Sequence, residues 1–210
     1  MLRYDRRGYG RSRHCGPPTS FDQQVDDLGS IVVGTRSIIV GHSFGGVIAL
    51  AFAQRHPALT AAVVAYEAPM AWQPWWPSTT AGAAATGVGG DPGDAAERFM
   101  RRMIGDERWE RLPPTTREQR RAEGPALVAE LRSIRDGTEP PYDPREVRSP
   151  VIAAHGSASI DHHRRTAVEL AGLVPDGELV VVEGAGHGVH LTHPASLAGV
   201  VRRAIELATA

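Results

Sequence analysis

The chain has 210 residues, of which 41% are hydrophobic and 22% charged, and its formal net charge at pH 7 is -1. Its length fits one domain with a small insertion, and the composition is ordinary for a globular protein. A charge so near zero gives no electrostatic reason to expect a nucleic acid or an anionic membrane as a partner. The single cysteine, Cys15, excludes an intramolecular disulfide.

Short apolar runs alternate with amphipathic stretches along most of the chain. Strands are expected at residues 2–5, 37–40, 61–66, 151–155 and 179–183. Helices are expected at residues 22–33, 44–55, 94–104, 124–135 and 197–208. Fully apolar strands separated by helices are typical of a parallel sheet with both faces covered. The sequence therefore predicts an α/β fold with a mostly parallel sheet and helices on both faces.

The character of the sequence changes after the strand at residues 61–66. The segment MAWQPWWPSTTAGAAATGVGGDPGD is rich in proline, glycine and tryptophan and has no strand pattern. The expected helices that follow it have arginine-rich exposed faces. We therefore expect residues 68–148 to form a mostly helical insertion into a core made of residues 1–67 and 149–210.

The segment SIIVGHSFGGVIALAFAQRHP carries the main chemical signal. It predicts a strand, then Gly41-His42-Ser43-Phe44-Gly45, then a helix. A G-x-S-x-G motif in this context is the nucleophile elbow, a tight turn that lifts the serine hydroxyl above the sheet. We expect Gly41 and Gly45 to be needed where strand and helix pass close together. The helix N-terminus and the N–H of Phe44 then face any negative charge that develops, so Phe44 is the expected oxyanion donor.

A serine hydroxyl is a poor nucleophile unless a base takes its proton. His187 follows the last expected strand in the glycine-rich loop EGAGHGVHLTHP, from which an imidazole can reach back to Ser43. His42 is fixed by the elbow, and His162 and His163 fall at the start of a helix. Other histidines also compete but are less well placed: His155, His190 and His193. We therefore expect His187 to be the base.

Three motifs together resemble those of the α/β-hydrolase family, in its serine hydrolase form. YDRRGYGRS is similar to the family's Asp-x-Arg-Gly-x-Gly-x-Ser loop, GHSFGG to its elbow, and EGAGHGVHLTHP to its histidine loop. The resemblance spans nearly all of the chain outside the insertion. It implies an α/β-hydrolase fold, a Ser-His-acid triad, and a substrate-covering lid at residues 68–148.

The resemblance also implies segments that the chain lacks. In the family, three strands precede the Asp-Arg-Gly loop, and a His-Gly oxyanion loop follows the third. Without that loop only the N–H of Phe44 remains as a donor, and losing one donor typically costs about 10²–10³ in rate. The strand at residues 2–5 then either pairs with residues 37–40 or stays unpaired. We expect an N-terminally truncated fold in which Met1 is not a natural domain start.

Two carboxylates compete for the acid of the triad. The family's usual position is a Gly-x-x-Asp after a late strand, but in HGSASIDHHRR Ser159 stands there and Asp161 comes two positions later. Glu67 ends the strand after the elbow helix, at a spacing from Ser43 similar to that in haloalkane dehalogenases, which are family members with their acid after that strand. Burying such a carboxylate unpaired would be costly. We favour Glu67 and keep Asp161 as the alternative.

The leading hypothesis is a serine hydrolase that acts on ester-like or activated carbonyl substrates through an acyl-enzyme. Ser43 attacks, His187 is the general base and then the acid, and Glu67 or Asp161 orients the imidazole. Four further side chains are expected to line an apolar substrate pocket: His42, Trp72, Trp75 and Trp76. Simple packing of the tryptophans against the sheet is the alternative for those three.

The alternative function is a catalytically impaired fragment or a non-catalytic α/β-hydrolase-like protein that binds a small molecule. The missing oxyanion loop favours it, whereas the intact Ser43 and His187 oppose it. A small-molecule substrate is the only partner expected, with no metal and no organic cofactor. The sequence shows neither a signal peptide nor an apolar run long enough to cross a bilayer, which predicts a cytoplasmic protein. The substrate, the bond type and the oligomeric state stay open.

Overall fold

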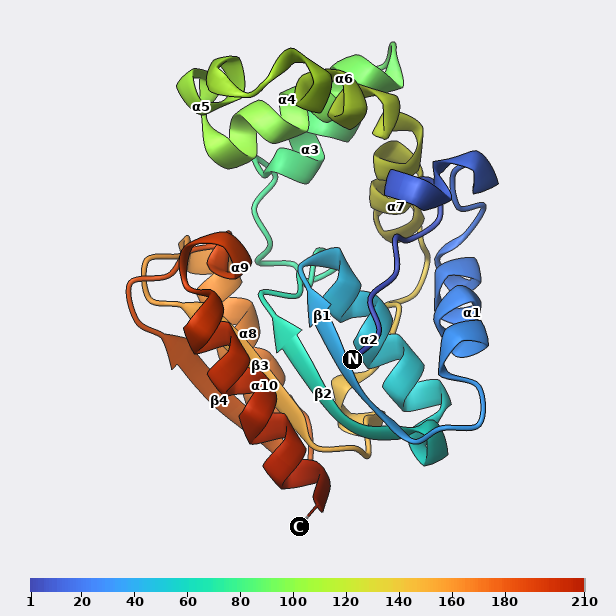
Figure 1. Ribbon diagram of the computed structural model, residues 1–210, viewed down its shortest axis with the longest axis vertical. Helices are drawn as coiled ribbons and strands as arrows, with labels where there is room; N and C mark the ends of the chain where they lie inside the picture. Colours follow the sequence, from blue (N-terminus) through green and yellow to red (C-terminus); the bar gives the residue numbers. More distant parts are fainter. Residues whose placement is uncertain (210) are drawn as a thin grey trace. The chain divides into compact units, whose positions relative to one another are not determined.

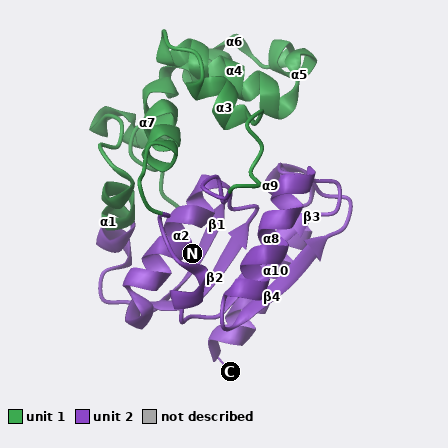
Figure 2. Cartoon of the chain, turned by 180° about the vertical axis from the view of Figure 1, so that it is seen from behind, with its two compact units in different colours: residues 1–27, 74–139 green, residues 28–73, 140–210 purple. Residues whose placement is uncertain are grey.

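The structure is a computed structural model that describes residues 1–209, and it divides into two compact units (Figure 2). Unit 1 consists of residues 1–27 and 74–139, and unit 2 of residues 28–73 and the chain from Pro140 onward. The expected division placed residues 1–67 in the core, whereas here residues 1–27 group with 74–139. That residues 68–148 act as a lid stays a prediction.

Unit 2 is built around a sheet of four parallel strands in the order β1-β2-β3-β4 (Figure 1). The strands are β1 (Ser37–His42), β2 (Thr60–Tyr66), β3 (Val151–Gly156) and β4 (Gly177–Val182). Because all four strands are parallel, their carboxyl ends lie at the same edge of the sheet. The α/β fold expected from the alternating pattern is confirmed.

Helices cover both faces of this sheet. On one face, Val200 and Ala204 of α10 (Pro194–Thr209) join a buried cluster with Val64 and Ile152 of the central strands. Helix α2 (Phe44–Arg55) packs on β1 and β2. Helix α8 (Asp161–Leu173) packs on β3 and β4. Strand side chains that point to the other face, such as Val63, are equally buried. Burial on both faces explains why the central strands β2 and β3 are apolar throughout instead of alternating.

Unit 1 is helical, and arginine–carboxylate pairs link its helices. Its helices are η1 (Gly10–Cys15), α3 (Ala81–Thr86), α4 (Pro92–Ile104), α5 (Asp106–Arg111), α6 (Pro114–Ala122) and α7 (Gly124–Arg135). The side chain of Asp91 caps α4 by accepting the N–H of Asp94. Arg121 of α6 pairs with Glu97 and Asp94 of α4. The helices expected at residues 94–104 and 124–135 correspond to α4 and α7.

Three short helices and α1 complete the described chain. These are η2 (Pro57–Leu59), η3 (Pro144–Glu146) and α9 (Val189–Thr192) in unit 2, and α1 (Phe21–Val32), which runs from one unit into the other. Within residues 1–209, no helix combines the length and the apolar character that crossing a membrane requires.

The strand expected at residues 2–5 is wrong. Residues 1–6 have no regular secondary structure, and the apolar Leu2 is exposed. The chain is instead tied down just after it. The guanidinium of Arg6 binds the buried Glu130 of α7 and donates to Gln24, and the Tyr9 hydroxyl donates to Glu130 at 2.7 Å. Side-chain hydrogen bonds within unit 1 therefore decide the path that the apolar pattern assigned to a strand.

Candidate active site

Ser43 lies between β1 and α2 in a strained backbone conformation. Its φ is 52°, a left-handed value that residues other than glycine rarely adopt. Its N–H donates to the carbonyl of Tyr66 at 2.8 Å, and its own carbonyl accepts the N–H of Gly46 at 2.8 Å. These two bonds connect the turn to the end of β2 and to the first turn of α2. The predicted strand–turn–helix around Ser43 is therefore present.

Glycines make this turn possible, although not the pair that the sequence suggested. A Cβ on Gly41 would lie 2.3 Å from the carbonyl oxygen of Gly45, and one on Gly46 would lie 2.6 Å from the Cβ of Ala68. A Cβ on Gly45 would meet nothing within 4 Å. The close approach of strand and helix thus requires glycine at positions 41 and 46, and the steric role expected for Gly45 is wrong.

Glu67 directly follows β2, and among residues 1–209 it is the only non-glycine residue besides Ser43 with a positive φ, at 48°. Its backbone N–H continues the ladder by donating to the carbonyl of Ala154 at 2.8 Å. The side chain turns inward and is buried. Strained backbone of this kind costs on the order of 1–3 kcal/mol and is typical of functional sites.

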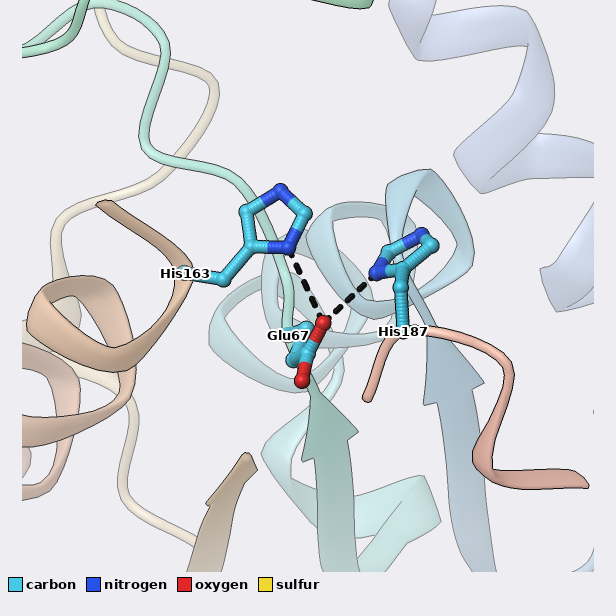
Figure 3. Close-up of side chains that lie close together, drawn as sticks. All are labelled: Glu67, His163 and His187. Carbon is cyan, nitrogen blue, oxygen red and sulfur yellow. Dashed lines mark hydrogen bonds and ion pairs between the residues drawn. The ribbon is translucent and has the colours of Figure 1, made fainter. Parts of the chain in front are cut away.

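The carboxylate of Glu67 accepts hydrogen bonds from four groups. Its Oε1 accepts the N–H of Gly156 at 3.0 Å and the hydroxyl of Ser159. Its Oε2 accepts Nδ1–H of His187 at 2.7 Å and Nδ1–H of His163 at 2.9 Å (Figure 3). The donors come from the end of β3, from the turn before α8, from α8 and from the loop after β4. Segments at and after the ends of β3 and β4 therefore hold the Glu67 carboxylate.

These donors also set the charge of Glu67. Burial alone would raise the pKa of this carboxyl, but the hydrogen bonds from His163, His187, Ser159 and Gly156 outweigh burial and hold the pKa well below its usual range. Glu67 is therefore ionised near neutral pH, and it places a full negative charge beside the ring of His187.

His187 is held in place by its loop. A Cβ on Gly156 would lie 2.0 Å from the carbonyl oxygen of Ala185, so the loop passes directly against the end of β3. The Tyr66 hydroxyl donates to the carbonyl of Gly186 at 3.0 Å, and Nε2–H of His42 donates to the carbonyl of His187 at 2.7 Å. The pKa of His42 is lowered to about 4 by burial and by His187, so that ring stays uncharged near neutral pH.

The tautomer of His187 follows from its partner. A carboxylate only accepts hydrogen bonds, so the proton lies on Nδ1 and the lone pair on Nε2 when the ring is neutral. The side chains of Ser43 and His187 make no hydrogen bond to each other in the part of the chain that the structure describes. Catalytic hydrogen bonds are often longer in structures without substrate than in the reacting complex.

Of the two competing acids, the structure brings Glu67 to His187 and leaves Asp161 elsewhere. Asp161 is the first residue of α8, its side chain is 92% exposed, and it forms an ion pair with Arg164. Such an exposed pair is typical of a helix surface.

The structure also places the other residues that were expected at the site. Phe44 is the first residue of α2, as the elbow requires, and its role as an oxyanion donor stays a prediction. The ring of His42 lies 4.5 Å from that of His187, centroid to centroid. Trp72 packs edge-on against Tyr142 at 5.3 Å. The rings of Trp75 and Trp76 lie 6.0 Å apart. That these side chains line a substrate pocket stays a prediction.

The sequence analysis missed two donors to Glu67. Ser159 stands three residues after Gly156, where the family usually has its acid, so its spacing was a usable signal. His163 was set aside because it falls at the start of a helix, and that placement is correct. Nothing in the local sequence shows that this helix start points at Glu67, which is 96 residues away in the chain.

A model described as the alpha/beta hydrolase family matches residues 1–200. The chain belongs to the alpha/beta hydrolase family. The family resemblance noted in its motifs is thus confirmed, and membership supports a hydrolase in general terms.

Solved structures show the same alpha/beta hydrolase fold. MenH from S. aureus is 19% identical, with a TM-score of 0.72, and the match covers 98% of this chain and 83% of that one. A thermophilic esterase from Thermogutta terrifontis is 20% identical, with a TM-score of 0.68 and coverages of 97% and 78%. E-2-(Acetamidomethylene)succinate hydrolase is 22% identical, with a TM-score of 0.65 and coverages of 96% and 80%. No curated protein matches the chain significantly.

Proposed function

We propose that this alpha/beta hydrolase is a serine hydrolase that cleaves ester-like or activated carbonyl substrates through an acyl-enzyme. The observation that carries the proposal is the 2.7 Å hydrogen bond between Nδ1 of His187 and Glu67 at the same sheet edge as the Ser43 turn. An imidazole held by a buried carboxylate, next to a serine on a strained strand-to-helix turn, is the arrangement that activates a serine hydroxyl.

In this mechanism His187 works from its Nε2. Its Nδ1 proton is committed to Glu67, so Nε2 accepts the proton of Ser43 as the hydroxyl oxygen attacks the substrate carbonyl. The ring then becomes an imidazolium, which the ionised Glu67 stabilises without taking a proton itself. His187 returns the proton to the leaving group, and the same steps with water release the acid product.

The negative charge on the carbonyl oxygen is stabilised from the N-terminus of α2. The backbone N–H of Phe44 is the donor that follows the nucleophile in this fold, and the helix dipole has the favourable sign there.

The test is intact-mass detection of covalent labelling by a fluorophosphonate on the full 210-residue chain. We expect one adduct per chain, its loss in Ser43→Ala, and its retention in Ser196→Ala, a control serine exposed on α10. Circular dichroism checks that each variant is folded. A folded wild-type chain that gives no adduct contradicts the proposal and favours the non-catalytic, ligand-binding alternative.

A further inference from the structure

The cluster around Glu67 contains one residue that the proposed reaction does not use. His163 is buried in the first turn of α8, and its Nδ1 points at the same carboxylate oxygen as the Nδ1 of His187 (Figure 3). The ligand atoms of Glu67, His163 and His187 all lie within 4.8 Å of one another. We propose that these three residues form a binding site for a zinc-like divalent transition metal ion, which holds the hydrolase in an inactive state.

The donor set selects the class of ion. Two imidazole nitrogens and one carboxylate oxygen are ligands typical of Zn²⁺ and its neighbours, whereas Ca²⁺ and Mg²⁺ prefer oxygen ligands alone. The three ligands lie on separate, well-supported elements: the end of β2, helix α8 and the loop after β4. Oε1 of Glu67 is held by Gly156 and Ser159, which leaves Oε2 directed at the two imidazoles.

Ion binding needs a rearrangement of all three ligands. Oε2 lies 2.7 Å from Nδ1 of His187 and 2.9 Å from Nδ1 of His163, and the two Nδ1 atoms lie within 4.8 Å of each other. In a tetrahedral zinc site with metal–ligand distances of about 2.1 Å, neighbouring ligand atoms lie about 3.4 Å apart. Oε2 therefore has to move away from both imidazoles, and the two imidazoles have to come to about the same spacing from each other, as the cation replaces the two hydrogen-bonding protons.

Solvent reaches the cluster from one side. The side chain of Glu67 is fully buried and that of His163 is 10% exposed, whereas the side chain of His187 is 22% exposed. The ion would enter beside His187 and keep water as its fourth ligand, as zinc does at sites with three protein ligands.

Binding at Nδ1 would stop the reaction by changing the tautomer of His187. A neutral imidazole carries one proton, so metal on Nδ1 moves that proton to Nε2. His187 then has no lone pair for the proton of Ser43, and Glu67 is occupied as well. The protons of both rings move from Nδ1 to Nε2, so binding to the neutral rings releases none. Inhibition rests on the proposed function, whereas metal binding does not.

The binding test is calorimetric titration of the full chain with ZnCl₂. It is carried out in a Cys15→Ser background, because exposed Cys15 and His14, with Sγ and Nε2 3.5 Å apart, form a second pair of possible zinc ligands. We expect one Zn²⁺ per chain, and a loss of affinity of about tenfold or more in His163→Gln. The matched control is His162→Gln, which replaces the adjacent histidine outside the cluster and is expected to keep the affinity. Absence of equimolar binding, or equal affinity in His163→Gln, would overturn the proposal.

The inhibition test is the rate of fluorophosphonate labelling with and without Zn²⁺. We expect Zn²⁺ to slow labelling of the Cys15→Ser chain, EDTA to restore the rate, and His163→Gln to show little slowing relative to its own zinc-free rate. Equimolar binding with an unchanged labelling rate overturns the inactive state. A chain that never labels but still binds Zn²⁺ through His163 contradicts the serine hydrolase proposal and leaves the metal site supported.

Discussion

Each unit of the molecule buries a glutamate, and the two carboxylates are partnered in different ways. Glu67 in unit 2 is 1% exposed and meets a backbone N–H, a hydroxyl and two imidazoles. Glu130 in unit 1 is 2% exposed and meets the guanidinium of Arg6 and the Tyr9 hydroxyl. The first set leaves the carboxylate charge facing the imidazole that gains a proton in the proposed mechanism. The second neutralises that charge with a permanent cation.

The pKa values of the two carboxyls move in opposite directions. For Glu67, burial is outweighed by the four hydrogen bonds and the pKa is lowered. For Glu130, burial is the larger influence, and Arg6 and Tyr9 offset only part of it, so the pKa is raised. The comparison indicates that burial by itself says little about a carboxylate's role. The number and direction of the donors distinguish the proposed triad acid, Glu67, from Glu130, which fastens the N-terminal segment to α7.

The largest expected difference between the two glutamates is in activity. Glu67→Gln should lower kcat/KM for an activated ester such as p-nitrophenyl acetate by about 10³–10⁴, because a neutral amide cannot stabilise the imidazolium and favours the wrong tautomer. Glu130→Gln should leave kcat/KM of the folded protein nearly unchanged. Asp161→Asn, the control for the alternative acid, should also have little effect. Similar losses in Glu67→Gln and Asp161→Asn would contradict the assignment of the acid.

The second largest expected difference is in stability, where substitution of Glu130 has the larger effect. Glu130→Gln should lower the free energy of unfolding at neutral pH by about 2–3 kcal/mol, because Arg6 loses its counter-charge. This is at the low end for a buried pair, since the Arg6 side chain is 25% exposed. Urea unfolding measures it, and Arg6→Gln should cost a similar amount. Additive losses in the double variant would show that the two residues do not interact.

A smaller effect is expected from the hydroxyl that supports Glu67. Ser159→Ala removes one of four hydrogen bonds, so kcat/KM should fall by about tenfold while the fold is kept. Ser157→Ala is a useful comparison, because Ser157 accepts the N–H of Gly184 and does not contact Glu67. An equal loss in both variants would indicate a general loosening of the loops and not a weakened acid.

The finest distinction is the sign of the pH dependence of stability. A lowered pKa means that Glu67 contributes stability above its unfolded value of 4.5, and that this contribution is lost as the pH falls. A raised pKa means that the contribution of Glu130 is largest below 4.5 and falls as the pH rises, to the part that the pair with Arg6 retains at neutral pH. Urea unfolding at about pH 3.5 and about pH 6 should therefore show opposite trends when each Gln variant is compared with the wild type. Trends of the same sign would contradict the comparison.

Sequence patterns within short windows predicted most of the fold. The strands β1 to β4 lie where apolar runs predicted them, and the central strands β2 and β3 are buried on both faces, as in a covered parallel sheet. The strand–turn–helix around Ser43 was readable for a similar reason, since the motif and both flanking elements are adjacent in the chain. The misassigned strand at residues 2–5 had the same local appearance, but side chains far away in the sequence decided its course.

The sequence by itself therefore determined the α/β fold, the strand–turn–helix around Ser43 and the choice of His187 as the expected base. Only the tertiary structure decided which carboxylate meets that histidine, because the contact joins residues 120 positions apart and depends on the left-handed φ of Glu67. It also decided that His163 shares the same carboxylate oxygen, which no local pattern indicates. Local periodicity reflects burial, whereas the direction of a side chain at a strand end is set by the backbone and the neighbouring strands together.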